Sequence, residues 1–516
     1  MKNLLIIIGL LIFSNLQAQY LNIEISNYAD PNEPSIYINP KNPLEIMGGA
    51  NINRYYFSED GGYSWDEGTL SSPSYGVWGD PMIITDTLGD FYYFHLANPP
   101  SGNWIDRIVC QKYNKLTHTW NDGSFMGLNG EKAQDKHWVV VDQKTNVIYV
   151  TWTQFDAYGS SDQFCQSNIM FSKSTDLGAS WSQAKQINSQ PGDCVDSDNT
   201  VEGAVPAVGP NGEVYVAWAG PNGIVFNKSF DGGETWLANE TFVCNQGGGW
   251  DMAIPGIYRS NGLPVTVCDI SNGPNRGTIY VNYTDQINGE DDTDVWLVKS
   301  TDGGETWTAP ARVNDDPAGK QQFLTWLAVD QSNGYLYFVF YDRRDYTNNQ
   351  TDVFMAVSSD GGQTFNNFVI SESPFNPTSG VFFGDYNNIS ATNNVVRPIW
   401  TRNQNGNLSI HTAITDMSVG ITQRDLVPAS VEQNFPNPFR ESTVFSYKIT
   451  HPGHIKLSVI NQLGEEIIVL KDAYSERGKF TVRFDMNDYH LSAGVYFFSL
   501  QAGNRSIKRK MVIANN

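Results

Sequence analysis

Acidic side chains recur at one position of a repeating pattern in this sequence. Each precedes a run of apolar residues typical of a buried β-strand. Six of seven repeat units carry one: Glu33, Asp80, Asp135, Glu202, Asp251 and Asp385. The remaining unit has Gln321 and Gln322. If the units surround an axis, these carboxylates meet at one opening, where repulsion requires protonation, cation pairing or a bound metal. Such a cluster can bind ligands or serve acid–base chemistry.

Aromatic residues stand near the same strand starts. Trp78, Trp138, Trp250 and Tyr386 are candidates for stacking on sugar rings, and packing between blades is the other role open to them. Two acidic loops, 193–202 and 285–294, offer oxygen ligands that suit calcium, but neither has EF-hand spacing. The metal and the cofactor are therefore left unassigned. The sequence also lacks the nucleophile elbow, the zinc-protease helix motif and the phosphate-binding loop.

A repeated fold is needed to bring the acidic positions together. Eight-residue segments such as SFDGGETW at 229–236 and STDGGETW at 300–307 occur five times. The Asp of each segment is Asp60, Asp176, Asp231, Asp302 or Asp360. A degenerate copy at 113–120 keeps Thr-Trp but lacks the Asp, and the spacing averages about 60 residues, which indicates a repeat architecture.

These segments resemble the Asp box, or BNR repeat, of sialidase-like β-propellers. The resemblance implies a ring of four-stranded sheets in which the boxes are structural hairpin tips. Three strand-like segments follow the last box, and residues 21–26 can supply a fourth strand. We therefore expect seven blades, with six, the number in sialidases, as the alternative. A composition with 13% aromatic residues and 46 glycines is consistent with an all-β protein.

Sialidase chemistry can be compared residue by residue. In sialidases three arginines grip the carboxylate of the sugar, and a Tyr nucleophile acts together with acidic groups. By this resemblance, the catalytic candidates here are Arg259, Arg343, Arg402, Tyr386 and Asp135. The arginine motif that sialidases carry before their first box is absent. Binding without catalysis therefore stays open.

The charge and the N-terminal sequence indicate an exported protein. The 516-residue chain has a net charge of −22, which argues against nucleic acid as a partner. Residues 1–19 have the basic start, short apolar run and small-residue cleavage site of a signal peptide. We expect no membrane span. Export permits disulfides, and the nearest cysteine pairs are Cys165 with Cys194 and Cys244 with Cys268.

A second module occupies residues 434–516. It opens with NFPNPF at 434–439 and ends with KRKMV at 508–512. Residues 426–516 contain 11 basic and 8 acidic residues, against 22 and 47 in the rest of the chain. The module resembles the type A C-terminal sorting domain of the type IX secretion system. This implies a small Ig-like β-sandwich that the translocon recognises, with the propeller at 20–415 and a linker at 416–433.

The sequence therefore predicts a monomeric propeller protein, secreted or held at the outer cell surface. The first hypothesis is recognition of extracellular glycan or protein ligands through the acidic opening. The alternatives are a glycoside hydrolase, such as an exo-α-sialidase, and a structural surface adhesin. Whether the protein is an enzyme stays open at this point.

Overall fold

The computed structural model describes residues 20–416, 429–449, 453–462, 464–476, 478–489, 491–502 and 505–514. The expected signal peptide and residues 417–428 of the expected linker lie outside this part of the chain. The described part is almost entirely strand, with one short helix, α1 (Met486–Tyr489). No helix in it is long and apolar enough to cross a membrane.

Seven sheets of four main strands make up the larger body of the described chain. Blade 1 contains β2 (Ser35–Ile38), β3 (Ile46–Ala50), β4 (Arg54–Ser58) and β5 (Asp66–Thr69). Blade 2 contains β6 (Gly79–Thr85), β7 (Phe91–Leu96), β8 (Ile108–Asn114) and β10 (Ser124–Met126), with β9 (Thr119–Trp120) beside β8. Blade 3 contains β11 (Ala133–Val141), β12 (Ile148–Phe155), β13 (Ser167–Ser174) and β14 (Lys185–Gln186).

The remaining blades follow the same order. Blade 4 contains β15 (Glu202–Val208), β16 (Val214–Gly220), β17 (Gly223–Ser229) and β18 (Thr241–Cys244). Blade 5 contains β21 (Val265–Cys268), β22 (Ile279–Asp285), β23 (Asp294–Ser300) and β24 (Ala311–Arg312). Blade 6 contains β25 (Gln322–Asp330), β26 (Tyr335–Asp342), β27 (Asp352–Ser358) and β28 (Asn366–Val369). Blade 7 contains β29 (Asn388–Thr392), β30 (Val395–Gln404), β31 (Asn407–Ile414) and β1 (Leu21–Ser26).

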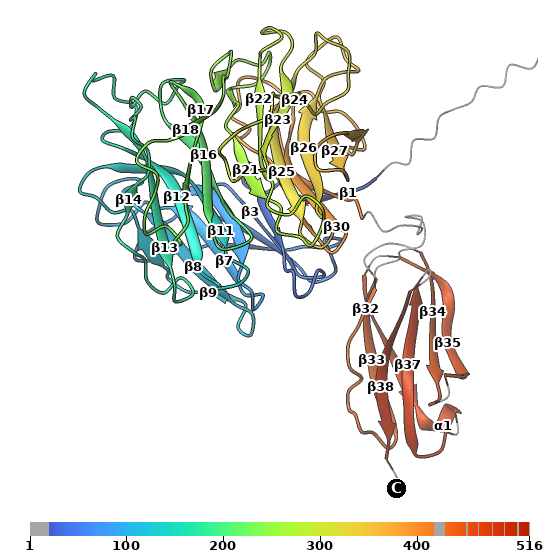
Figure 1. Cartoon of the computed structure of the whole chain (residues 1–516). Coiled ribbons are helices and arrows are strands. Elements are labelled where there is room, and N and C mark those ends of the chain that lie inside the picture. Colours follow the sequence, from blue (N-terminus) through green and yellow to red (C-terminus); the bar gives the residue numbers. More distant parts are fainter. Residues whose placement is uncertain are drawn as a thin grey trace, which may run out of the picture.

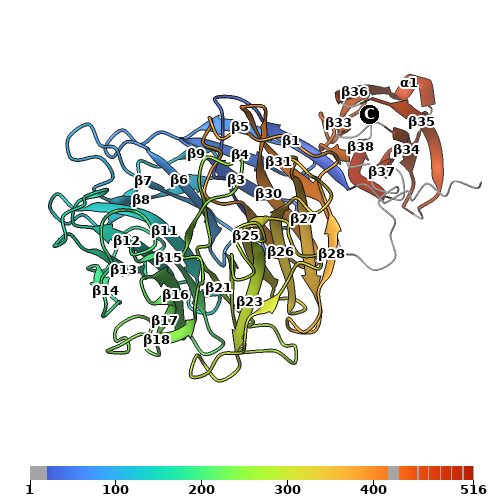
Figure 2. The same ribbon diagram turned by 90° about the horizontal axis from the view of Figure 1, so that it is seen from above.

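The seven sheets form a closed ring. The first strand of each blade contacts the first strands of both neighbouring blades, and Figure 2 shows β11, β15, β21 and β25 near the centre with β14, β18 and β28 at the rim. The N-terminal strand β1 pairs with β31, so both ends of the ring meet in blade 7. The seven-bladed propeller is thereby confirmed, because the segment expected to supply the fourth strand of the last blade does so.

The Asp boxes connect the third and fourth strands of their blades. In the first box, Asp60 Oδ1 accepts hydrogen bonds from the backbone N–H groups of Tyr63 (3.0 Å) and Ser64 (2.9 Å). The Ser58 hydroxyl donates to the same oxygen at 2.9 Å. The carboxylate therefore closes a turn of its own chain, as the structural role of the boxes predicted.

A basic residue joins each of several blades to the box of the next. Lys173, Lys228 and Lys299 donate from Nζ to the first glycine carbonyl of the following box at 2.6–2.8 Å. Arg397 Nε does the same for Gly61 at 2.7 Å, at the joint between blades 7 and 1. The box face is thus tied together by satisfied polar contacts.

The opposite face begins with a repeated irregularity in the inner strands. The strands β6, β11, β15 and β25 each contain a register shift near their first residues. Within these shifts Asp80, Lys136 and Leu324 have φ values of 47° to 52°, and Gly203 has a φ of 77°. A β-bulge of this kind redirects a side chain and costs backbone energy, so it is commonly found next to functional sites.

The C-terminal body is a small β-sandwich, drawn in red in Figure 1. One sheet contains β32 (Ala429–Val431), β33 (Ser442–Ile449) and β36 (Gly478–Asp485). The other contains β35 (Glu466–Ser475), β34 (Gly453–Ile460), β37 (Gly494–Ala502) and β38 (Arg505–Ile513). Its core includes Phe445 and Phe498, whose rings stack at 3.8 Å. Strand β32 lies in the segment expected to be linker, so the sandwich begins earlier than the sequence pattern indicated.

Candidate functional site

A buried lysine is at the centre of the acidic face. Lys136 Nζ lies 2.7 Å from Asp385 Oδ2, 3.8 Å from Asp80 Oδ2 and 4.0 Å from Glu33 Oε1. Burial opposes the charged form of Lys136, but the surrounding carboxylates, Asp385 first, raise its pKa well above the usual value. Three of the six acidic positions therefore converge on one cation. Sequence reasoning missed this lysine because alternation along the strand does not reveal the bulge that turns it inward.

Arg259 approaches the same carboxylate from another side. Its Nε donates to Asp385 Oδ1 at 2.7 Å, and its terminal amino group binds Asp385 Oδ2. Burial alone would raise the pKa of Asp385, but Lys136 and then Arg259 hold that pKa well below its usual range. Asp385 is ionised between two cations, so its negative charge is already compensated by the protein.

Glu33 is the most enclosed member of this group. Its Oε1 accepts from the backbone N–H of Asp385 at 3.2 Å, and its Oε2 accepts from the side chain of Asn51. Burial, and then the charge of Asp80, raise the pKa of Glu33 well above its usual value. We therefore assign it a structural role between blades 7 and 1.

Three further carboxyl groups form what we call the acid corner: Asp135, Asp196 and Glu202. Burial raises the pKa of Asp135 to about 7. Burial, followed by the charge of Asp196, raises the pKa of Glu202 well above its usual value. The side chain of Glu202 is fully buried, and its protonated carboxyl group shares a hydrogen bond with Asp196. Neither oxygen accepts a hydrogen bond from an N–H or hydroxyl group of the described residues, so the corner holds carboxyl groups that lack such donors.

Asp196 is positioned by its own loop and by the neighbouring blade. Its Oδ2 accepts from the Tyr158 hydroxyl at 2.6 Å and lies 3.9 Å from an Arg259 amino group. A disulfide between Cys165 and Cys194 joins the loops that carry Tyr158 and Asp196. That pairing is confirmed, whereas Cys244 and Cys268 are free and buried, so the second expected pairing is wrong.

A cavity of about 380 Å³ opens above these charged groups. Its wall includes Trp78, which is one of the expected stacking residues, and three aromatic residues that the sequence pattern did not assign to the site: Trp104, Tyr158 and Phe382. Trp78 and Trp104 are 39% and 44% exposed and pack edge to face, with ring centroids 6.0 Å apart. The Trp104 ring in turn meets Tyr158 at 5.7 Å. A smaller pocket, which includes Glu202 and Asp196, shares Lys136 and Arg259 with this cavity.

The three candidate arginines do not converge. Arg343 is buried, and it donates to the Pro255 carbonyl at 2.7 Å and the Thr351 hydroxyl at 3.0 Å. Arg402 donates to the carbonyls of Ser373 (2.8 Å) and Pro374 (2.9 Å). The expectation of a carboxylate-binding triad is therefore corrected. Only Arg259 lines the cavity, since the other two stabilise loops with their own carbonyl partners.

The expected nucleophile is also enclosed. Tyr386 is buried against Trp138 and Trp326, with ring centroids at 5.1 Å and 6.4 Å. Burial, followed by the charges of Glu33 and Asp80, raises the pKa of the Tyr386 hydroxyl well above its usual value. The phenol therefore stays neutral, which disfavours it as a nucleophile.

Trp138 and Trp250 were expected to line the acidic opening of the ring, which we call the mouth, and both make packing contacts. Trp138 packs on Trp326 at 4.6 Å in the channel. Trp250 is buried and donates its indole N–H to the Thr200 carbonyl at 3.0 Å. Trp138 therefore packs inside the channel, whereas Trp250 is buried but lines the smaller pocket beside Glu202 and Asp196. The exposed aromatic surface of the cavity comes from Trp78 and Trp104 instead.

Asp251 does not precede an inner strand, which corrects its alignment with the other five acids. It opens β19 (Asp251–Met252), which pairs with β20 (Ser260–Asn261), and the inner strand β21 begins only at Val265. Asp251 is exposed at the edge of the smaller pocket and accepts from the Ser197 hydroxyl at 3.0 Å. The insertion that displaces it also delivers Arg259.

The 285–294 loop considered for calcium differs in structure from an open ligand set. Asp294 accepts hydrogen bonds from Asn288 and Asn314, both at 2.6 Å. Asp285 accepts from the backbone N–H groups of Gly247 and Gly248. Within the described residues, no three His, Cys, Asp or Glu side chains are arranged to hold a metal ion.

Comparisons with solved structures return propellers of low similarity. A ulvan lyase has 12% identity and a TM-score of 0.47, over 76% of this chain and 96% of its own. A Hadza microbial sialidase has 15% identity and a TM-score of 0.41, over 73% and 75%. The NanB sialidase of Streptococcus pneumoniae has 12% identity and a TM-score of 0.40, over 77% and 70%. The activities in those names are properties of those proteins. No curated protein matches this sequence.

The C-terminal sandwich has a direct family match. Residues 433–514 match the family described as the secretion system C-terminal sorting domain. The predicted module is therefore confirmed, and it directs export to the cell surface or beyond. The chain is a type IX secretion cargo that carries a seven-bladed propeller ahead of its sorting domain.

Proposed function

We propose that the propeller binds an extracellular glycan in the cavity at the acidic mouth. The observation that carries this proposal is the pairing of exposed tryptophans with a fixed polar floor. Large aromatic side chains are seldom left this exposed in a concave site unless they contact a ligand. Flat indole faces suit the C–H faces of sugar rings, and carboxylates and ammonium groups suit sugar hydroxyls.

The floor is organised before any ligand arrives. Lys136 and Arg259 are both held by Asp385 at 2.7 Å, so neither side chain has to be ordered on binding. Prior ordering reduces the entropy cost of binding and favours specific recognition. The bulges at Asp80 and Lys136 add backbone strain that packing alone would not require.

A panel of polysaccharides tested by calorimetry against the full chain examines this proposal. We expect Trp104→Ala to weaken binding of the recognised glycan by about tenfold or more. The control is Phe230→Ala, because Phe230 is 68% exposed but lies in a box on the opposite face. Equal losses in the two variants, or no binding by the wild-type chain across the panel, would contradict a glycan site at the mouth.

Glycoside hydrolysis is the second candidate, and one observation favours it. Asp135 lines the cavity with a pKa of about 7, so at neutral pH it is present in both protonation states, as a general acid or base requires. The scattered arginines and the enclosed Tyr386 do not support the sialidase version of this chemistry. Release of reducing sugar without formation of an unsaturated product by the wild-type chain, lost in Asp135→Asn and kept in Tyr386→Phe, would establish hydrolysis at Asp135.

A further inference from the structure

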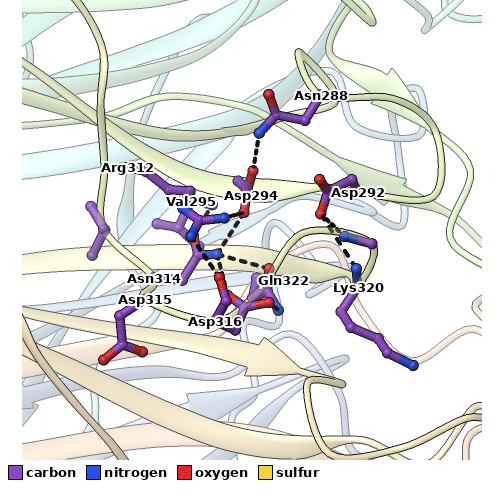
Figure 3. A network of polar contacts seen from close by, with 12 residues as sticks. Asn288, Asp292, Asp294, Val295, Arg312, Asn314, Asp315, Asp316, Lys320 and Gln322 are labelled. Carbon is purple, nitrogen blue, oxygen red and sulfur yellow. Dashed lines mark hydrogen bonds and ion pairs between the residues drawn. The ribbon is translucent and has the colours of Figure 1, made fainter.

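The acid corner differs from other buried carboxylates in this molecule. Between blades 5 and 6, Asn314 Nδ2 lies 2.6 Å from Asp294 Oδ1 and 2.7 Å from Asp316 Oδ1, and Asn288 donates to Asp294 as well (Figure 3). The buried carboxylates of Asp294 and Asp316 therefore receive their hydrogen bonds from side chains of the protein itself. Glu202 is buried to the same degree, but the partner of its carboxyl group is another acid, Asp196, and no N–H or hydroxyl group of the described residues donates to it. Once ionised, Glu202 would therefore need a donor that comes from outside.

The lining of the two adjoining pockets has a strong excess of negative groups. Eight carboxyl groups line them: Asp30, Glu33, Asp80, Asp135, Asp196, Glu202, Asp251 and Asp385. Two basic side chains do so, Lys136 and Arg259, and both already bind Asp385. An incoming anion would therefore find no uncompensated cation, whereas an incoming cation would find the acid corner.

The aromatic wall reaches the acid corner directly. The Tyr158 hydroxyl donates to Asp196 at 2.6 Å, and the Trp104 ring packs against Tyr158. A sugar ring held on this wall would present one substituent to Asp135, Asp196 and Glu202. A substituent with several N–H donors and a positive charge satisfies the most carboxyl oxygens there.

We propose that the recognised glycan carries free amino groups, as in a polymer of unacetylated hexosamine, and that one ammonium group binds in the acid corner. This inference rests on the proposed glycan-binding function and specifies its ligand class. The ammonium group supplies N–H donors to the ionised Glu202, which releases the proton that it shares with Asp196. The net charge of −22 also attracts a polycationic chain at long range. A metal is the weaker occupant, because the described acids lack a metal-binding arrangement.

Calorimetry at pH 6 with the full chain tests the ligand class. The probes are a glucosamine hexasaccharide, its fully N-acetylated form, a galacturonate hexasaccharide and hexalysine. We expect the amino form to bind at least about tenfold more tightly than the other three. Binding should release about one proton, because the ammonium group favours the ionised forms of Asp135 and Glu202. That release appears as a binding enthalpy that depends on the buffer.

The variants separate this inference from the function on which it rests. Glu202→Gln should weaken binding of the amino form by about tenfold and leave the acetylated form unchanged. Glu59→Gln, which removes an exposed charge on the box face, should change neither. Equal binding of the amino and acetylated forms, or tighter binding of galacturonate, overturns the amino-sugar inference but retains glycan binding. Hexalysine binding as tightly as the amino form overturns it in favour of a basic peptide. Failure of all glycans overturns both proposals.

Discussion

The two faces of the propeller differ in how their carboxyl groups are hydrogen-bonded. On the box face, Asp60 and its counterparts accept hydrogen bonds from turn amides and hydroxyls, and basic residues link four of the five boxes to the preceding blade. On the mouth face, Glu202 accepts no hydrogen bond from an N–H or hydroxyl group of the described residues, and Asp135 has a raised pKa. The repeat therefore provides stability at one face and leaves unsatisfied groups at the other. This division is what we expect of a scaffold that carries a binding site.

The largest effect on stability should come from removing Arg397, which joins blade 7 to the Asp box of blade 1. Arg397 is buried, and it donates to Gly61 and pairs with Asp416 at 2.5 Å. We expect Arg397→Ala to lower the free energy of unfolding by about 3–5 kcal/mol, because it leaves a buried acceptor and an unpaired carboxylate. Chemical denaturation measures this. Glycan affinity of the folded variant should be unchanged.

Arg402 on the same strand supplies the matched control for that joint. Its guanidinium binds the carbonyls of Ser373 and Pro374 and the Ser373 hydroxyl, and it makes no contact between a blade and a box. Arg402→Ala should cost less than about 1 kcal/mol. A loss as large as that of Arg397→Ala would show that the inter-blade link is not what stabilises this face.

The next effect concerns the rim of the mouth. Replacing Cys165 and Cys194 together by serine removes the disulfide that joins the Tyr158 and Asp196 loops. We expect the free energy of unfolding to fall by about 2–4 kcal/mol and the glycan affinity to fall as well, since both loops line the ligand site. Chemical denaturation measures the change in stability, and calorimetry on the same protein preparation measures the change in glycan affinity. A stability loss with unchanged affinity would remove this rim from the site.

The two faces should also respond to pH with opposite signs. Burial raises the pKa of Asp135 to about 7, so the folded state loses stability as pH rises from about 4 to about 7. Hydrogen bonds from Ser180 lower the pKa of the box residue Asp176, so its contribution is present above about pH 4 and is lost as pH falls. Each of these two carboxyl groups changes the slope of the free energy of unfolding against pH by up to about 1.4 kcal/mol per pH unit.

Stability measured from pH 3 to 8 separates the two contributions. Asp135→Asn should reduce the loss of unfolding free energy between about pH 4 and pH 7. Asp176→Asn should reduce the loss of unfolding free energy as the pH falls below about 4. If both substitutions alter the same limb, the proposed difference between the faces does not hold.

The smallest effect should follow metal removal. Because the described acids lack a metal-binding arrangement, chelation by EDTA should move the Tm by less than about 1 °C. A decrease of several degrees, restored by calcium, would instead place a cation among the mouth carboxylates.

Local sequence patterns were sufficient to predict the scaffold. The box spacing and the strand at Leu21–Ser26 predicted seven blades because each blade is a repeated local unit. The sorting domain was predictable for the same reason, from its ordered motifs. The site was predictable only in part. Glu33, Asp80 and Asp385 do meet at the mouth.

The remaining parts of the site depend on irregular backbone. Lys136 turns inward because of a bulge, and Arg259 arrives on an insertion that also displaced Asp251 from its expected position. Neither event leaves a periodic signal in the sequence. Arg343 and Arg402 were chosen by residue type alone, and type does not show that loop carbonyls would occupy both guanidinium groups.

The most direct test of the account is the substitution Glu202→Gln, measured for stability and for binding of the glucosamine hexasaccharide in one protein preparation. Removing an ionisable group from a fully buried site should leave the free energy of unfolding unchanged or raise it by about 1 kcal/mol, while affinity falls by about tenfold. A less stable variant that binds as tightly as the wild-type chain would contradict the account, because Glu202 would then serve the fold and not the ligand.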